Sequence, residues 1–155
     1  MNKTAKKLAF WAIIVAGVFL IQSVISIELI KLNLTLLLVY YFGLKKGELQ
    51  GVAVGISVGF LEDTLSGQLI GPGMLGKGLA GILPAYLSDG FFIWTPLLGM
   101  LAVFALTIVD ETVVYTSLSI FSQRPAPLQD FIALTFVKAL INAPFGWLIR
   151  PEDDR

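Results

Sequence analysis

The sequence predicts an all-α membrane protein with six transmembrane helices and with both the N- and C-termini in the cytoplasm. Hydrophobic residues make up 56% of its 155 residues and charged residues only 14%, whereas soluble domains carry roughly 25% charged residues. A chain of this length holds about six apolar runs of about 20 residues each, which is the length that crosses a bilayer. Glycines also recur at every fourth position of one run, a spacing that lets helix backbones approach closely in lipid.

We expect one multi-pass transmembrane domain over residues 1–155. The first span is too long for a signal sequence, and no small-residue cleavage site comes after it. The second ends at a Lys45-Lys46 pair, and the third carries the glycines. Pro84 in the fourth predicts a kink, with a re-entrant segment as the alternative to a full crossing. The fifth is long enough to tilt, and the sixth begins after a proline-rich break. These spans lie at about 8–27, 29–44, 49–65, 74–89, 94–120 and 131–149.

The basic residues predict the orientation. An even number of spans places both termini on one side of the membrane, and cytoplasmic loops carry an excess of Lys and Arg. One predicted side holds only Lys31 and Arg124. The other side holds seven basic residues, Lys3, Lys6, Lys7, Lys45, Lys46, Arg150 and Arg155. That side is therefore predicted to be cytoplasmic.

A glycine ladder runs along the third span. Each step of four residues drifts only about 40° around a helix, so the ladder forms a shallow groove on one side, and small residues continue into the following turn. The groove either packs against neighbouring helices of the same chain or docks a helix of a partner protein. The residues concerned are Gly47, Gly51, Gly55, Gly59, Ser66, Gly67 and Gly71.

Ionisable residues interrupt the apolar runs. Each charge costs roughly 2.5–3.5 kcal/mol at the bilayer centre, so the charges are expected to pair. Their predicted depths favour Asp63–Lys77 and Asp110–Lys138 pairs, which leaves Glu62 and Glu111 facing a wet cavity or a partner protein. The network is either structural or a path for substrate or protons. Its members are Asp63, Lys77, Asp110, Glu111 and Lys138, and Asn33 and Asn142 are candidates for hydrogen bonds between helices.

Composition also limits the chemistry that we expect. The chain has no cysteine and no histidine, and its formal net charge is zero. Thiol nucleophiles, disulfides and the commonest metal ligands are therefore missing, and nothing favours nucleic acid as a partner. The turn at Ser66–Gly73 lacks the spacing of a phosphate-binding loop. We predict no catalytic residue, no cofactor-binding residue and no metal site.

Three segments resemble one protein family. Leu36–Gly51 is similar to the second-span signature of the bacterial rod shape-determining protein MreD. Gly55-x3-Gly59-Phe-Leu-x-Asp63-x2-Ser66-Gly67-x3-Gly71 resembles the third span and the turn after it in that family, and Lys138-Ala-Leu-Ile-Asn142-Ala-Pro144 resembles the last span. The sequence departs from the family at Asn33, where a proline-aspartate pair is common, and Lys77 and the Asp110-Glu111 doublet have no counterpart.

The resemblance implies a function. Members of this family are non-catalytic components of the bacterial cytoplasmic membrane. They dock the scaffold protein MreC and, more indirectly, work with MreB filaments, the cell-wall transpeptidase and the glycosyltransferase in peptidoglycan synthesis and cell-shape regulation. The six-helix layout also resembles the substrate-binding subunits of vitamin-uptake transporters. That alternative needs a roomy pocket with aromatic and polar groups converging from the periplasmic side, and the sequence offers few such groups there. A proton-conducting subunit that uses Asp63 or Glu111 is a third possibility.

Overall fold

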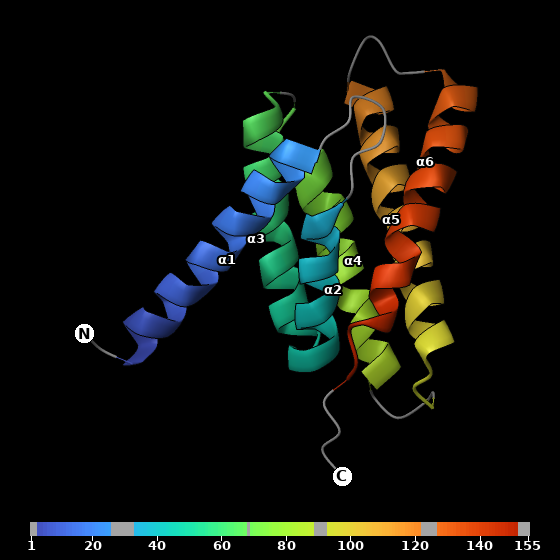
Figure 1. Cartoon of the computed structure of the whole chain (residues 1–155). Coiled ribbons are helices and arrows are strands. Elements are labelled where there is room, and N and C mark those ends of the chain that lie inside the picture. Colours follow the sequence, from blue (N-terminus) through green and yellow to red (C-terminus); the bar gives the residue numbers. More distant parts are fainter. Residues whose placement is uncertain (1–2, 26–32, 68, 89–92, 122–126, 152–155) are drawn as a thin grey trace.

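The fold is all-helical over the part of the chain that the computed structural model describes, residues 3–25, 33–67, 69–88, 93–121 and 127–151. Consecutive helices run in alternating directions, so the start of the first helix and the end of the last helix lie at the same end of the bundle (Figure 1). The elements are α1 (Lys3–Ile25), α2 (Leu34–Lys46), α3 (Glu48–Ser66), α4 (Pro72–Ser88), α5 (Pro96–Phe121), α6 (Leu128–Asn142) and the 3-10 helix η1 (Ala143–Trp147).

The helices coincide with the predicted apolar runs, with two informative differences. Helix α2 begins only at Leu34, because the Asn33 side chain accepts a hydrogen bond from the Leu36 amide and caps the helix there; residues 29–32 of the predicted span lie outside the described residues. Helix α6 ends at Asn142 and continues as η1, because Pro144 has no amide hydrogen to extend the α-helical ladder. Pro84 lies inside α4, which continues without a break.

Two of the described helices are long and apolar enough to cross a membrane. They are α5, with a mean hydropathy of 2.0, and the continuous segment Leu128–Trp147, with a mean hydropathy of 1.2. The apolar part of α1, Ala9–Gln22, is shorter. By length and composition the described residues therefore contain two candidate spans, and not the six that the sequence predicts.

Helices α2, α3 and α4 meet backbone to backbone at glycines. A Cβ atom added to Gly51 would overlap the carbonyl oxygen of Gly81 and lie 2.7 Å from the Cα atom of Gly43. The same addition at Gly55 would overlap the Lys77 carbonyl, and at Gly59 the Gly73 carbonyl. Side chains of α2, α4 and α5 complete the core, with Leu36, Tyr40, Ala80 and Val103 almost fully buried.

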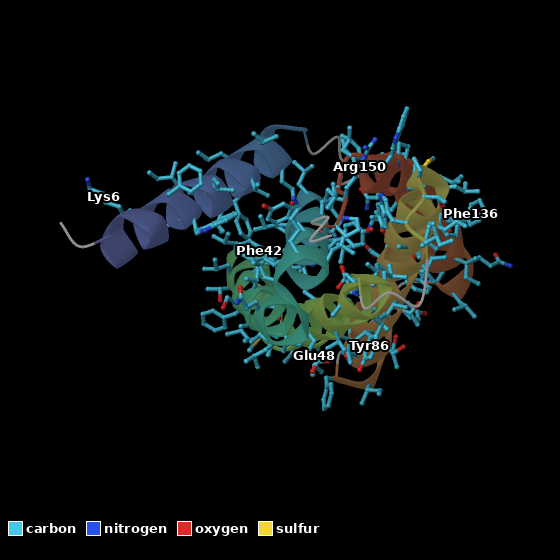
Figure 2. The ribbon with its side chains drawn as sticks, turned by 90° about the horizontal axis from the view of Figure 1, so that it is seen from below. Lys6, Phe42, Glu48, Tyr86, Phe136 and Arg150 are labelled. Atoms are coloured by element: carbon cyan, nitrogen blue, oxygen red, sulfur yellow. The ribbon has the colours of Figure 1, made fainter. Side chains whose placement is uncertain are left out.

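Helix α1 stands apart from this bundle. It leans away from the other helices, with Lys6 at its far end, as two perpendicular views show (Figures 1 and 2). Its described contact with α2 is aromatic, since the Trp11 and Phe42 ring centroids lie 4.6 Å apart. The bundle therefore consists of a closely packed group of helices and one loosely attached helix, which leaves room between them.

Candidate functional site

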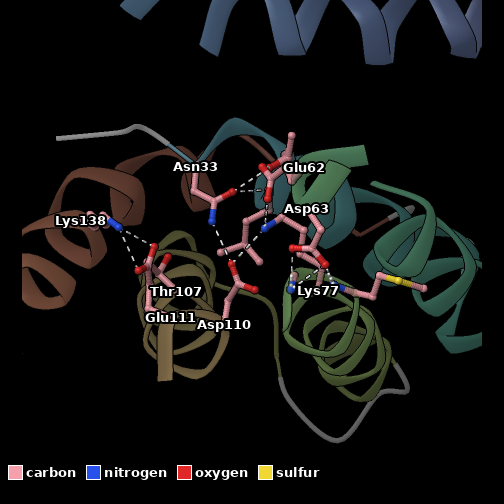
Figure 3. A network of polar contacts seen from close by, with 12 residues as sticks. Asn33, Glu62, Asp63, Lys77, Thr107, Asp110, Glu111 and Lys138 are labelled. Atoms are coloured by element: carbon pink, nitrogen blue, oxygen red, sulfur yellow. Dashed lines mark hydrogen bonds and ion pairs between the residues drawn. The ribbon is translucent and has the colours of Figure 1, made fainter. Parts of the chain in front are cut away.

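Polar side chains from α2 to α6 converge inside the bundle, at the positions shown in Figure 3. Asn33, at the start of α2, lies between two groups of charged residues. One group contains Glu62, Lys77 and Asp110, and the other contains Glu111 and Lys138. Because these residues come from five segments of the chain, the cluster joins helices that are distant in sequence.

Lys77 bridges two carboxylates. Its ammonium nitrogen lies 2.5 Å from Glu62 Oε2 and 3.3 Å from Asp110 Oδ2, and both Lys77 and Asp110 are only 2% exposed. The side-chain amide nitrogen of Asn33 donates to the same Asp110 oxygen at 2.9 Å. The other oxygen, Asp110 Oδ1, has no hydrogen-bond partner among the described residues. It lies against Gly76, where any side chain would overlap it. This triad is therefore fixed by packing as well as by charge.

The second pair is more accessible. The Lys138 ammonium lies 2.9 Å from both oxygens of Glu111, and the two side chains are 21% and 20% exposed. Glu62 is 22% exposed in the first group. Glu62, Glu111 and Lys138 therefore present charge toward the surface of the cluster, whereas Lys77 and Asp110 lie behind them.

The start of α2 also faces the carboxylates. The Thr35 hydroxyl donates to Glu62 Oε1 and lies 2.8 Å from Asn33 Oδ1. A helix N-terminus carries partial positive charge. The start of α2 therefore stabilises negative charge on Glu62 and Asp110, which lie beside it. Asn142 Oδ1 accepts a hydrogen bond from the backbone amide of Asn33 at 3.3 Å, and the side-chain amide of Asn142 donates to the Thr107 hydroxyl. The prediction that Asn33 and Asn142 make hydrogen bonds between helices is confirmed.

The two predicted ion pairs are wrong. Lys77 pairs with Glu62 and Asp110, and Lys138 pairs with Glu111. Adjacent helical residues point about 100° apart, so equal depth does not bring Asp63 to Lys77. Asp63 instead accepts hydrogen bonds from the backbone amides of Gly71, Gly73 and Met74 at 2.8–3.3 Å. It therefore caps the start of α4.

The glycine ladder packs within the chain. Gly51, Gly55 and Gly59 lie against the backbone of α4, so the within-chain interpretation is confirmed, and these three positions are not available to dock a partner helix. The remaining small residues shape the turns. Gly47, Gly67 and Gly71 have φ values of +87°, +64° and +132°, which favour glycine, and the Ser66 hydroxyl donates to the Asp63 carbonyl.

A cavity of about 1350 Å³ lies between α1 and the charged cluster. Its walls are mainly apolar and come from α1 and α3. Its polar floor contains Asn33, Glu62, Asp63, Lys77, Asp110, Glu111 and Lys138. A roomy space with converging polar groups is therefore present, although Phe19 is the one aromatic residue in its described lining. Glu62 has no partner inside the chain in the sequence-based prediction, because the direction of its side chain, about 100° from that of Asp63, depends on how α3 packs.

The site offers ion pairing and hydrogen bonding at the end of an apolar cavity. Among the described residues, no group of three or more His, Cys, Asp or Glu side chains is placed to hold a metal ion. Compared with known protein families, with curated proteins and with solved structures, the chain matches none of them.

Proposed function

We propose that this chain is a multi-pass protein of the bacterial cytoplasmic membrane and that all six helices cross the bilayer. The observation that carries this proposal is the inverted distribution of side chains. Large apolar residues such as Ile13, Leu65 and Phe121 are more than 70% exposed, whereas Lys77 and Asp110 are almost fully buried. Such a surface is unfavourable in water, but lipid solvates it and drives the charges inward.

The burial of the candidate spans supports the same conclusion. Only 28% of the apolar stretch of α5 and 22% of the apolar stretch within Leu128–Trp147 are buried. The core helix of a soluble protein, by contrast, is mostly buried. Helices α3 and α4 have lower hydropathy because they carry glycines and inward-facing charges, which need not contact lipid. Extraction tests the proposal: the protein should stay in the membrane fraction at alkaline pH and require detergent for release. A soluble protein would contradict it.

Within this setting, we propose a non-catalytic role in the bacterial cell-elongation complex, with the scaffold protein MreC as the direct partner. The resemblance to the MreD family carries this proposal, and the geometry supports the resemblance. The matched residues between Gly59 and Gly71 form one unit, because Gly59 packs against Gly73, Asp63 caps α4 and two glycines adopt positive φ. Substitution of the glycines at these positions would be strained, so this part of the pattern has a structural role in this chain.

Affinity capture from native membranes tests this role. We expect MreC to be recovered directly, with MreB, the transpeptidase and the glycosyltransferase recovered in smaller amounts. Depletion of the protein should also convert rod-shaped cells into rounded cells. Recovery of the inserted protein without MreC would contradict the proposed role.

The cavity favours a second candidate, the substrate-binding subunit of a vitamin-uptake transporter. Its volume exceeds the roughly 300–1,000 Å³ of common small-molecule pockets, and charged groups converge on its floor. A thermal-shift screen of the purified protein with individual vitamins separates the two functions. A clear increase in melting temperature with one vitamin would favour uptake over cell elongation.

A further inference from the structure

Small side chains line both walls of the cavity at helical spacing. Ala12 and Ala16 lie on α1, and Ala53 and Ser57 lie on α3; all four are exposed and all four line the cavity. Small residues four positions apart let another helix approach a backbone closely in lipid. The ladder glycines already have α4 against them, whereas no described helix lies between these two pairs.

The floor of the cavity carries excess negative charge. Among the described residues, Glu62, Asp110 and Glu111 face two cations, Lys77 and Lys138, so three negative charges minus two positive charges leave one negative charge without a described counter-ion. Asp63 adds a further negative charge, although its oxygens are occupied by backbone amides. Asp110 Oδ1 is buried without a hydrogen-bond partner among the described residues. A cationic group that enters the cavity would therefore be favoured.

The dimensions of the cavity suit a helix. Its lining on α1 extends from Ala12 to Gln22, which corresponds to about 15 Å along a helix axis. A small ligand would leave most of this length unfilled. Glu62 is the member of the Lys77 triad that is most accessible from the cavity, at 22% exposure compared with 3% and 2% for the other two side chains.

We infer that this cavity docks a single transmembrane helix of a partner protein, and that this helix carries one Lys or Arg that pairs with Glu62. The small residues of α1 and α3 hold the two sides of the docked helix, and its basic group neutralises the excess charge of the floor. The inference rests on the proposed membrane location and deepens the proposed docking role.

Designed peptides test the chemistry of the occupant. Three Leu/Ala transmembrane peptides that differ only in one central residue (Lys, Leu or Glu) are incorporated with the full-length protein into liposomes, and association is measured by energy transfer. We expect the Lys peptide to bind about tenfold more tightly than the Leu peptide, the ratio that 1.4 kcal/mol produces, and the Glu peptide to bind most weakly. Equal binding of the three peptides would overturn the inference.

Two variants and one control locate the binding. Glu62→Gln should remove the preference for Lys, and Ala16→Leu should abolish binding because the larger side chain fills the cavity. Ala133→Leu changes an exposed alanine of α6 that does not line the cavity and should bind like the unmodified protein. A preference for Lys that persists in Glu62→Gln would overturn the inference. Tightly bound phospholipid that no peptide displaces, detected by native mass spectrometry, would assign the cavity to lipid instead.

The inference and the proposed function fail separately. If Ala16→Leu still captures MreC, the partner docks elsewhere and only the inference is wrong. If the unmodified protein binds the Lys peptide but captures no MreC, the docking site stands and the cell-elongation role fails.

Discussion

At the scale of single residues, Lys77 is the cation that two carboxylates of the cluster share. Its ammonium is enclosed by Glu62 and Asp110, and Asn33 holds the second carboxylate in place. Removal of one member of a buried ionic group leaves the others uncompensated, which costs more than the intact group contributes. Replacement of Lys77 is therefore expected to be costly.

Lys77→Met should lower the free energy of unfolding by about 3–5 kcal/mol, because two buried carboxylates lose their counter-ion. Lys6→Met is the matched control, since Lys6 is exposed at the far end of α1 (Figure 2), and it should have almost no effect. Reversible unfolding in mixed detergent micelles measures both values. Similar losses in the two variants would contradict the buried triad.

Glu111 and Lys138 should show direct energetic coupling. A double-mutant cycle with Glu111→Gln and Lys138→Met should give a coupling energy of about 1 kcal/mol, as expected for residues in contact. The same cycle with Asp110→Asn and Lys138→Met should give a clearly smaller value. A larger coupling for Asp110 than for Glu111 would restore the pairing predicted from depth.

The sequence predicts which charges form the cluster but not how they pair. Depth along a span can be found by counting residues, whereas pairing also depends on direction around the helix axis. Glu62 and Asp63 are nearly equal in depth, yet one reaches Lys77 and the other caps α4. Likewise, Asp110 pairs with Lys77, whereas the adjacent Glu111 pairs with Lys138. The direction of each side chain is set by helix packing, which the apolar pattern alone does not define.

At the scale of helices, the α3–α4 hairpin is held together by one carboxylate and by close backbone contact. Asp63 satisfies amide groups at the start of α4 that have no partner within that helix. Pro72 occupies the first helical position, where no amide hydrogen is needed. The hairpin turn is therefore fixed by Asp63 of α3 together with the positive-φ glycines of its own loop.

Asp63→Ala should destabilise the protein by about 1–2 kcal/mol, the upper range for loss of a helix cap. Thr64→Ala is a suitable control, because the Thr64 side chain is exposed and, among the described residues, bonds only to the Phe60 carbonyl within its own helix. Unfolding curves in detergent should show a clear loss for Asp63→Ala and almost none for Thr64→Ala. An unchanged stability of Asp63→Ala would exclude the capping role.

Gly55→Ala should also destabilise the protein, by about 1–3 kcal/mol, because the added Cβ atom overlaps the Lys77 carbonyl and forces α3 and α4 apart. Gly17→Ala adds the same methyl group where no atom lies within 4 Å. There the higher helix propensity of alanine should leave stability unchanged or slightly increased. Unfolding in detergent micelles measures both variants. A neutral Gly55→Ala variant would show that the two backbones are not in contact.

Helix positions were largely predictable because long apolar runs have clear ends, such as the Lys45-Lys46 pair and the glycine-rich turn before α4. The late start of α2 was not predictable from hydropathy, since Leu32 and Leu34 flank Asn33 with equally apolar residues. The cap at Asn33 exists because Asp110 and Asn142 bind it from other helices. Tertiary contacts therefore set this boundary.

At the scale of the whole molecule, the alternating helix directions place the α2–α3 turn and the α3–α4 turn at opposite ends of the bundle (Figure 1). In the proposed membrane setting, the distribution of basic residues predicts that the first of these ends lies in the cytoplasm. The chain contains no cysteine, so single cysteines can be introduced without background.

Glu48→Cys and Leu69→Cys should be labelled from opposite sides of the membrane, because both side chains are exposed and they lie near opposite ends of α3. A membrane-impermeant maleimide added to intact spheroplasts should label only Leu69→Cys. Permeabilised membranes should react at both positions, which serves as the control. Labelling of Glu48→Cys in intact spheroplasts would reverse the orientation.

The all-helical character of the described residues was predictable from the apolar runs, but the cavity was not. Apolar side chains occupy most faces of α1, so its sequence does not reveal which face packs against the bundle. Trp11 meets Phe42, Gln22 near the other end donates to Glu62, and the N-terminal end of the helix leans away from the bundle (Figure 1). The space beside it depends on the angle of α1, and the residues that contact the bundle from α1 have partners far apart in the sequence.

The contact between Lys77 and Glu62 also constrains how the protein is made. In the proposed membrane setting, α4 would carry an unneutralised ammonium into lipid if it left the translocation channel alone, at a cost of roughly 2.5–3.5 kcal/mol. Helix α3 is synthesised first and already bears the matching carboxylate. The two segments should therefore enter the bilayer together as a preassembled hairpin, and biosynthesis would proceed by pairs of helices.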